Sequence, residues 1–144
     1  MENVETSMAE ALASAHIALL RDLRELELAG HTASKHHLPA LRARLEATRA
    51  HIAEHFRFEE EDGYMAIIRE REPRLEQAIG ELATEHRQLL SALDALLVES
   101  ASTPVLDEVM CARVCQWINH VRQHEAREDH LVQDAFDLDI RTED

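Results

Sequence analysis

The sequence predicts an all-α protein, an up-down-up-down antiparallel four-helix bundle, and three observations support this fold. Of its 144 residues 45% are hydrophobic but only 3% aromatic, and three glycines and three prolines leave few breaks in long helices. Apolar residues recur at helical spacing in four segments. Finally, three residues recur 70 or 69 positions later: His16, His55 and Glu59 as His86, His124 and Glu128. The chain therefore reads as two copies of one helical hairpin.

The first helix is expected from about residue 7 to residue 29, with Gly30 as its stop. Its predicted core stripe is Leu12, His16, Leu19, Leu20 and Leu23. A polar connector leads to Pro39, where the second helix begins. The core stripe of that helix is Leu41, Leu45, Ile52, His55 and Glu59. A kink or brief break is expected near Gly63.

The third helix is expected to start near Pro73, and the fourth at Thr103-Pro104, where threonine can cap it. The core stripe of the third is Leu75, Ile79, Leu82, His86, Leu89, Leu90, Leu93 and Leu96. That of the fourth is Val105, Val109, Val114, Trp117, Ile118, Val121, His124, Glu128 and Leu131. All three prolines thus stand where a helix begins, because a missing N–H costs least there. Residues 1–144 are expected to form one domain, with a core of about 7–132 and a short acidic C-terminal tail.

The formal net charge of −14, with Lys35 as the single lysine, disfavours binding to nucleic acid or to anionic membranes. No stretch approaches the ~20 apolar residues of a membrane span, and the first residues lack the basic and apolar runs of a signal peptide. We expect a soluble, cytoplasmic protein, a monomer or weak dimer, without nucleic-acid or membrane partners. Cys111 and Cys115 are expected to be reduced residues at the core boundary.

The histidines and glutamates suggest a metal site. A histidine and a glutamate four positions apart lie on one face of a helix, about 6 Å apart, and can reach the same ion. In an antiparallel hairpin, two residues lie level when the midpoint of their numbers falls in the turn. The midpoints are 35.5 for His16 and His55, 70.5 for His55 and His86, and 105 for His86 and His124. All fall at or near the predicted connectors, so four histidines and two glutamates are expected in one layer.

Four imidazoles and two carboxylates suit a pair of first-row transition ions, iron above all, better than calcium, magnesium or a structural zinc. If Glu59 and Glu128 bridge the ions, each ion receives two nitrogens and two carboxylate oxygens. An oxo or other solvent-derived bridge then leaves about one position open for O2 or peroxide. For any single histidine, the alternative is a hydrogen-bonded core residue.

The pattern His16, His55-x-x-x-Glu59, His86, His124-x-x-x-Glu128 resembles that of hemerythrin-like (HHE cation-binding) domains, over about residues 10–132. Residues 55–64 and 124–129 are particularly similar to bacterial single-domain members. The resemblance implies a four-helix bundle with a non-haem di-iron centre. Such centres bind O2, sense O2, iron or redox state, or decompose peroxide.

Two departures from the O2-carrying hemerythrins matter. Their third helix supplies two histidines four apart, whereas the neighbours of His86 at that spacing are Leu82 and Leu90. Their fourth helix uses an aspartate five positions after the histidine, which here is Asp129; the spacing of His55 and Glu59 favours Glu128 instead. With one nitrogen ligand missing, we expect decomposition of H2O2, a catalase-like activity and a form of redox protection, rather than O2 carriage. The alternative is a module that binds or senses O2, NO or iron without turnover.

Other polar residues have open roles. His51 and His120 stand one turn before His55 and His124 and are expected to be hydrogen-bond donors to ligands, proton relays, extra ligands or partly buried residues. Tyr64 is expected to pack near the site but off the ligand stripe on helical phase. In the run of residues 59–62 only one member is expected to point inward.

Overall fold

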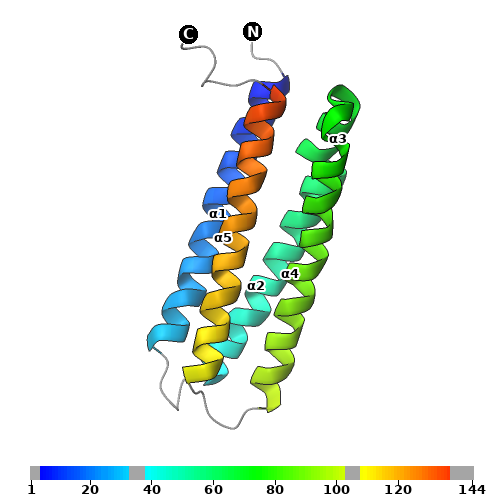
Figure 1. Cartoon of the computed structure of the whole chain (residues 1–144). Helices are drawn as coiled ribbons and strands as arrows, with labels where there is room; N and C mark the ends of the chain where they lie inside the picture. Colours follow the sequence, from blue (N-terminus) through cyan, green and yellow to red (C-terminus); the bar gives the residue numbers. More distant parts are fainter. Residues whose placement is uncertain (1–3, 33–37, 103–107, 137–144) are drawn as a thin grey trace.

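The computed structural model describes residues 4–32, 38–102 and 108–136, which contain helices and no strand. The elements are α1 (Val4–Thr32), α2 (Leu38–Glu61), α3 (Tyr64–Arg71), a 3-10 turn (Pro73–Leu75), α4 (Glu76–Ser102) and α5 (Glu108–Phe136). Four long helices pack together, and each contacts two others: α1 lies against α2 and α5, and α4 lies against α2 and α5 (Figure 1). The all-α prediction is confirmed for the described residues. None of the described helices is both long and apolar enough to cross a bilayer.

Among the described residues, the helix boundaries agree with the predicted proline positions, whereas the boundary predicted at Gly30 does not. Pro39 is the second residue of α2, and Pro73 begins the 3-10 turn that leads into α4. The predicted start of the fourth helix, Thr103-Pro104, lies outside the described residues. Gly30 does not stop α1, which continues to Thr32. The prediction was wrong because glycine ends a helix only where the chain needs its conformational freedom; here Cys111 Sγ, 3.1 Å away, donates to the Gly30 carbonyl.

The break expected at Gly63 is confirmed, since α2 ends at Glu61 and α3 begins at Tyr64. A Cβ at Gly63 would lie 2.9 Å from Glu59 Cα and 3.0 Å from the Phe58 carbonyl oxygen. Glycine is therefore the residue that lets the chain turn this closely over the last turn of α2. The break changes the direction in which the residues after Gly63 point.

A polar layer divides the core into two apolar clusters. On α1, Leu12 belongs to one cluster and Leu19 to the other, with His16 buried between them. The other long helices repeat this order, with Phe56, Glu59 and Tyr64 on α2–α3, Leu89, His86 and Leu82 on α4, and Val121, His124 and Leu131 on α5. The buried polar residues therefore lie at one level of the bundle.

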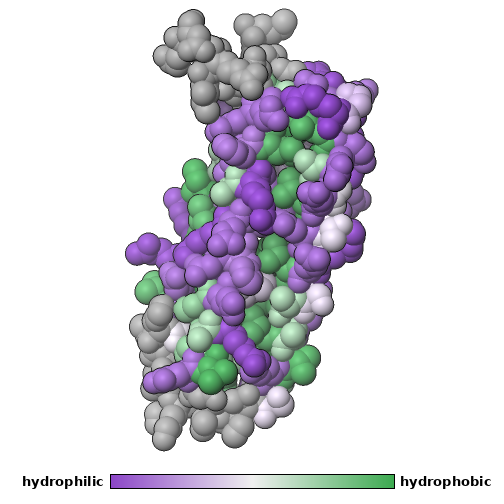
Figure 2. Space-filling view, viewed as in Figure 1, coloured by the Kyte–Doolittle hydropathy of each residue, from purple (hydrophilic) through white to green (hydrophobic). Residues whose placement is uncertain are grey.

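Most of the predicted core residues that the structure describes are buried, His55 and Leu90 are half-buried, and two are exposed; Val105 lies outside the described residues. Leu20 is 39% exposed and Val109 is 58% exposed. Each stands next to the residue that takes the core position, Leu19 or Met110. The prediction therefore assigned to the core an apolar residue one position away from the buried one. Figure 2 shows apolar patches of this kind scattered over a mainly hydrophilic face. Cys111 and Cys115 are half-buried thiols, as predicted.

Candidate metal centre

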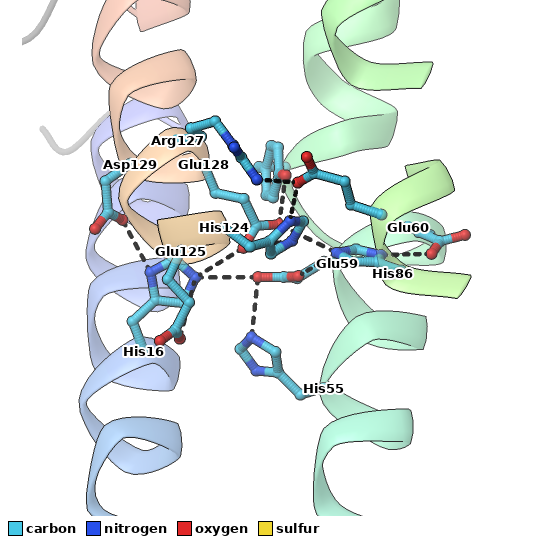
Figure 3. Close-up of polar contacts among 12 residues, drawn as sticks. His16, His55, Glu59, Glu60, His86, His124, Glu125, Arg127, Glu128 and Asp129 are labelled. Atoms are coloured by element: carbon cyan, nitrogen blue, oxygen red, sulfur yellow. Dashed lines mark hydrogen bonds and ion pairs between the residues drawn. The ribbon is translucent and has the colours of Figure 1, made fainter. Parts of the chain in front are cut away.

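The six predicted ligands lie together in the polar layer, contributed by four helices (Figure 3). Five of them are at most 4% exposed: His16, Glu59, His86, His124 and Glu128. The sixth, His55, has a side chain 10% exposed. The midpoint argument thus predicted correctly which residues would meet.

The six residues form two overlapping groups whose ligand atoms lie within 4.8 Å of one another: His16, His55, Glu59 and Glu128, and Glu59, His86, His124 and Glu128. Two ligand atoms that bind the same first-row ion, each at about 2.1 Å, lie at most about 4.2 Å apart. The His16 Nε2 atom is 3.2 Å from Glu59 Oε2 and 3.2 Å from Glu128 Oε1. The His86 Nε2 atom is 3.1 Å from Glu59 Oε1 and 3.3 Å from Glu128 Oε2. The layer can therefore hold metal, and both glutamates belong to both groups.

Carboxylates outside the layer orient three of the histidines. Asp129 lies 2.9 Å from His16 Nδ1. Glu60 lies 2.6 Å from His86 Nδ1, and Glu85 lies 2.6 Å from His124 Nδ1. An imidazole that donates from Nδ1 presents the lone pair of Nε2 to the other side, which is the usual arrangement of metal-binding histidines. Each of these Nε2 atoms faces the centre of the layer.

The repeat explains the role of Asp129. Glu60 directly follows Glu59, and Asp129 directly follows Glu128, 69 positions later (129 − 60 = 69). Glu60 supports His86 from outside, and Asp129 supports the equivalent His16 in the same way. The Glu128 side chain is buried among the imidazoles, whereas that of Asp129 is 51% exposed. The geometry therefore favours Glu128 as the ligand, as the spacing argument expected.

Several buried polar atoms of the layer make no hydrogen bond. Among the described residues, eight buried side-chain nitrogen or oxygen atoms lack a hydrogen bond, and five belong here: His55 Nε2, Glu59 Oε1, His124 Nε2 and both carboxylate oxygens of Glu125. The first three have only ion-pair contacts of 3.0, 3.1 and 3.5 Å within the layer. Buried polar atoms rarely stay unpaired in native proteins. Metal ions would satisfy these atoms, so the donor set fits them.

The electrostatics of the metal-free layer support this fit. Burial lowers the pKa of His16, but its bonds to Asp129, Glu128 and Glu59 outweigh burial and raise that pKa to about 12. The pKa of His86 is raised to about 10 because carboxylates again outweigh burial. Burial also raises the pKa values of Glu59 and Glu128, yet the histidines around them lower both. Without metal, the protonated histidines thus carry the positive charge that the carboxylates stabilise. Metal binding releases such protons.

Tyr64 packs at the site, as expected, but it points toward the ligand stripe, which helical phase did not indicate. It is 1% exposed, and its hydroxyl donates to Glu128 Oε2 at 2.6 Å. The expectation that it lies off the ligand stripe was wrong because the helix breaks at Gly63, so the phase of α2 does not continue. Burial and the nearby Glu128 raise its pKa, which keeps it a hydrogen-bond donor. In the run of residues 59–62, Glu59 is the one buried member, as expected, and Glu60, 34% exposed, contacts His86 from outside the layer.

Glu125 was also missed. It is 3% exposed, and its Oε2 lies 3.9 Å from His16 Nε2. Burial raises its pKa to about 8. The available signal was a difference between the repeats, since Glu125 stands where the first half has Phe56.

His51 and His120 do not contribute to the layer. Both are exposed, and His51 Nδ1 pairs with Asp22 Oδ2 at 2.8 Å. A residue four positions earlier on a helix is turned by about 40°, which here moves both histidines out of the core. Ile52 and Val121, each 0% exposed, occupy the core positions one turn before the ligands instead.

No protein-family model matches the chain, and neither the curated proteins nor the solved structures contain a match. The function of the layer is therefore inferred from its geometry and chemistry.

Proposed function

We propose that the chain is a hemerythrin-like, up-down-up-down four-helix bundle that binds two iron ions and decomposes hydrogen peroxide. One observation carries this proposal: two buried four-residue groups share Glu59 and Glu128, so that two ions can lie side by side with both carboxylates between them. The contacts of α1 with α2 and α5, and of α4 with the same two helices, are those of such a bundle.

Iron is favoured by the donor set. Each group offers two imidazole nitrogens and two carboxylate oxygens, a mixture that suits iron better than the all-oxygen sites of magnesium and calcium. In the part of the chain that the structure describes, neither group contains a cysteine, so a thiolate-bound structural zinc is disfavoured.

A pair of iron ions can supply and accept the two electrons that 2 H2O2 → 2 H2O + O2 requires. The chain's own residues prepare the site. Asp129, Glu60 and Glu85 hold three imidazoles in the tautomer that directs Nε2 inward. Tyr64 donates to Glu128 Oε2 and fixes the orientation of that carboxylate. The apolar clusters on both sides of the layer exclude bulk water.

Peroxide decomposition is favoured over O2 carriage by what surrounds His86. Leu82 is 6% exposed and Leu90 is half-buried, and neither can replace the second histidine of the O2 carriers. The two groups therefore offer equal numbers of imidazoles, and neither ion is saturated with nitrogen. Such a pair suits a reaction that uses both ions.

The test is anaerobic loading of metal-free protein with Fe(II), followed by iron counting and oxygen-electrode assay with H2O2. We expect two iron per chain and evolution of O2. The variant His86→Leu should bind fewer than two iron ions and evolve no O2. The variant His51→Ala, which changes an exposed histidine, should keep both the iron content and the evolution of O2. Iron content of one or none contradicts the di-iron proposal. Two iron without O2 evolution contradicts the peroxide reaction and favours the binding or sensing of O2, NO or iron.

A further inference from the structure

Glu125 is a buried carboxylate outside the six-residue cluster. Its side chain is 4% exposed, and neither of its oxygens accepts a hydrogen bond. Figure 3 places it beside His16, and Oε2 lies 3.9 Å from His16 Nε2. A buried carboxylate that accepts no hydrogen bond is costly unless it is protonated or binds a cation at close range. The position therefore needs an explanation beyond packing.

The other half of the repeat shows what this position holds there. Glu125 follows Phe56 by 69 positions, the same interval that separates His124 from His55 (125 − 56 = 124 − 55 = 69). The Phe56 ring stacks on His86, with centroids 3.9 Å apart and planes 8° apart. Because His86 is the repeat of His16, a phenyl ring covers one of the two equivalent histidines and a carboxylate approaches the other.

A second difference between the halves concerns the outer carboxylates. Glu85 supports His124 from outside, at 2.6 Å from Nδ1. Its counterpart 70 positions earlier is Ala15, on the helix that packs beside His55 (85 − 70 = 15). Alanine cannot hydrogen-bond an imidazole with its side chain. Relative to the His86 half, the His16 half therefore lacks an outer carboxylate and gains an inner one.

We propose that Glu125 is a further metal ligand that binds only the ion held by His16 and His55, so that the two metal positions differ chemically. The proposal rests on the proposed di-iron function. The 3.9 Å separation from His16 Nε2 is within the limit of about 4.2 Å for two atoms on one first-row ion. Glu125 is not in the group whose ligand atoms lie within 4.8 Å of one another, so its side chain must turn toward the ion on binding. Both oxygens of Glu125 are available for this role.

The consequence is an uneven pair of ions. The ion at His16 and His55 has two nitrogen and three carboxylate ligands, and the ion at His86 and His124 has two of each. The additional negative charge stabilises the more highly charged oxidation state at the first position. The second position has fewer protein ligands, so peroxide is expected to bind there first.

The test compares wild-type protein with Glu125→Gln, which keeps the shape of the side chain and removes its charge. Metal-free protein is titrated anaerobically with Fe(II) by calorimetry, and the loaded protein is studied by Mössbauer spectroscopy. We expect one of the two dissociation constants of the variant to be about 100-fold or more higher than in the wild type. Loss of a residue that only hydrogen-bonds a ligand already lowers metal affinity about 10–100-fold. The other constant should stay unchanged. The two iron signals, unequal in the wild type, should become more alike.

Metal-free stability separates a ligand from a structural residue. Glu125→Gln removes a buried carboxylate that accepts no hydrogen bond and whose ion-pair contact with His16 is long, at 3.9 Å, so the melting temperature of the metal-free variant should equal or exceed that of the wild type. With iron bound, the variant should melt at a lower temperature than the wild type. Equal destabilisation of both forms would indicate a structural role and overturn the proposal. Glu125→Leu, which imitates the apolar residue of the other half, provides a second variant with the same expected order.

The outcomes distinguish this proposal from the proposed function. Two ions bound by Glu125→Gln with wild-type constants and spectra would overturn the role of Glu125 and leave the di-iron proposal intact. A wild-type protein that binds fewer than two ions would overturn both. Glu85→Gln serves as the matched control, because it alters the carboxylate that contacts His124 Nδ1 and should weaken binding of the ion at His86 and His124 instead.

Discussion

Replacing Glu128 and Asp129 one at a time should separate a ligand from a residue that supports one. Glu128 Oε1 lies 3.2 Å from His16 Nε2, and Oε2 lies 3.3 Å from His86 Nε2, so this carboxylate belongs to both groups. Glu128→Ala reduces the donors of each group from four to three. Asp129→Ala removes none, but it frees the Nδ1 atom of His16.

The expected magnitudes differ accordingly. Loss of an outer carboxylate costs about 10–100-fold in metal affinity, or about 1.4–2.7 kcal/mol. The Asp129 side chain is 51% exposed, so water can replace it and the lower end of that range is expected. Loss of a shared ligand should exceed this range at both ions. In an excess of iron, Asp129→Ala should therefore still bind two ions, whereas Glu128→Ala should bind one or none.

Iron content after desalting and competition with a chelator of known affinity measure these two effects. Circular dichroism of the metal-free variants verifies that both remain helical. If Asp129→Ala loses the ions while Glu128→Ala keeps both, then the aspartate is the ligand, and the assignment from the repeat is refuted.

Three further predictions follow from the same contacts. Removal of two ions, each present at about 100 times its dissociation constant, should cost about 5 kcal/mol and lower the melting temperature by roughly 10–20 °C, and an unchanged melt in calorimetry would argue against ligands shared by four helices. Gly63→Ala should destabilise the protein by about 1–3 kcal/mol in urea unfolding, because its Cβ would lie 2.9 Å from Glu59 Cα; wild-type stability would show that the backbone there can shift freely. In metal-free protein the pKa of His86 is raised from 6.5 to about 10 and that of His16 to about 12, so their stabilising effect is complete below about pH 6.5 and is lost as the pH rises through the folded-state values. The urea midpoint in the presence of a chelator should therefore fall between pH 7 and pH 10, and a flat or rising profile would contradict these pairings.

The level of the site could be predicted because helix geometry and connector positions fix it. The spacing of His55 and Glu59 places both on one face of α2, and the connectors bring His16 and His86 to the same height. The same reasoning failed where local packing decides between neighbours. Leu19 and Leu20 are equally apolar, and the side of α1 that faces the other helices determines which one is buried.

The supporting residues were harder to predict, because their roles depend on contacts between helices. Asp129 approaches His16 across 113 positions, and Glu85 approaches His124 across 39. Tyr64 reaches Glu128 only because the chain breaks at Gly63, and the spacing from Glu59 does not show the new direction. A comparison of the two halves residue by residue would have identified Asp129 and Glu125, since one keeps its counterpart's chemistry and the other does not.

The polar layer has a consequence for how the helices find their alignment. The two apolar clusters are rich in leucine, and such surfaces can slide past one another at little cost. A shift of α1 by one turn, about 5.4 Å, would move His16 among leucines and bring Leu12 or Leu19 against carboxylates. Leaving charges unpaired in this way costs several kcal/mol, so the layer should select one register even without metal. Folding would then complete the pocket before any ion arrives, and loading would require no rearrangement of the helices.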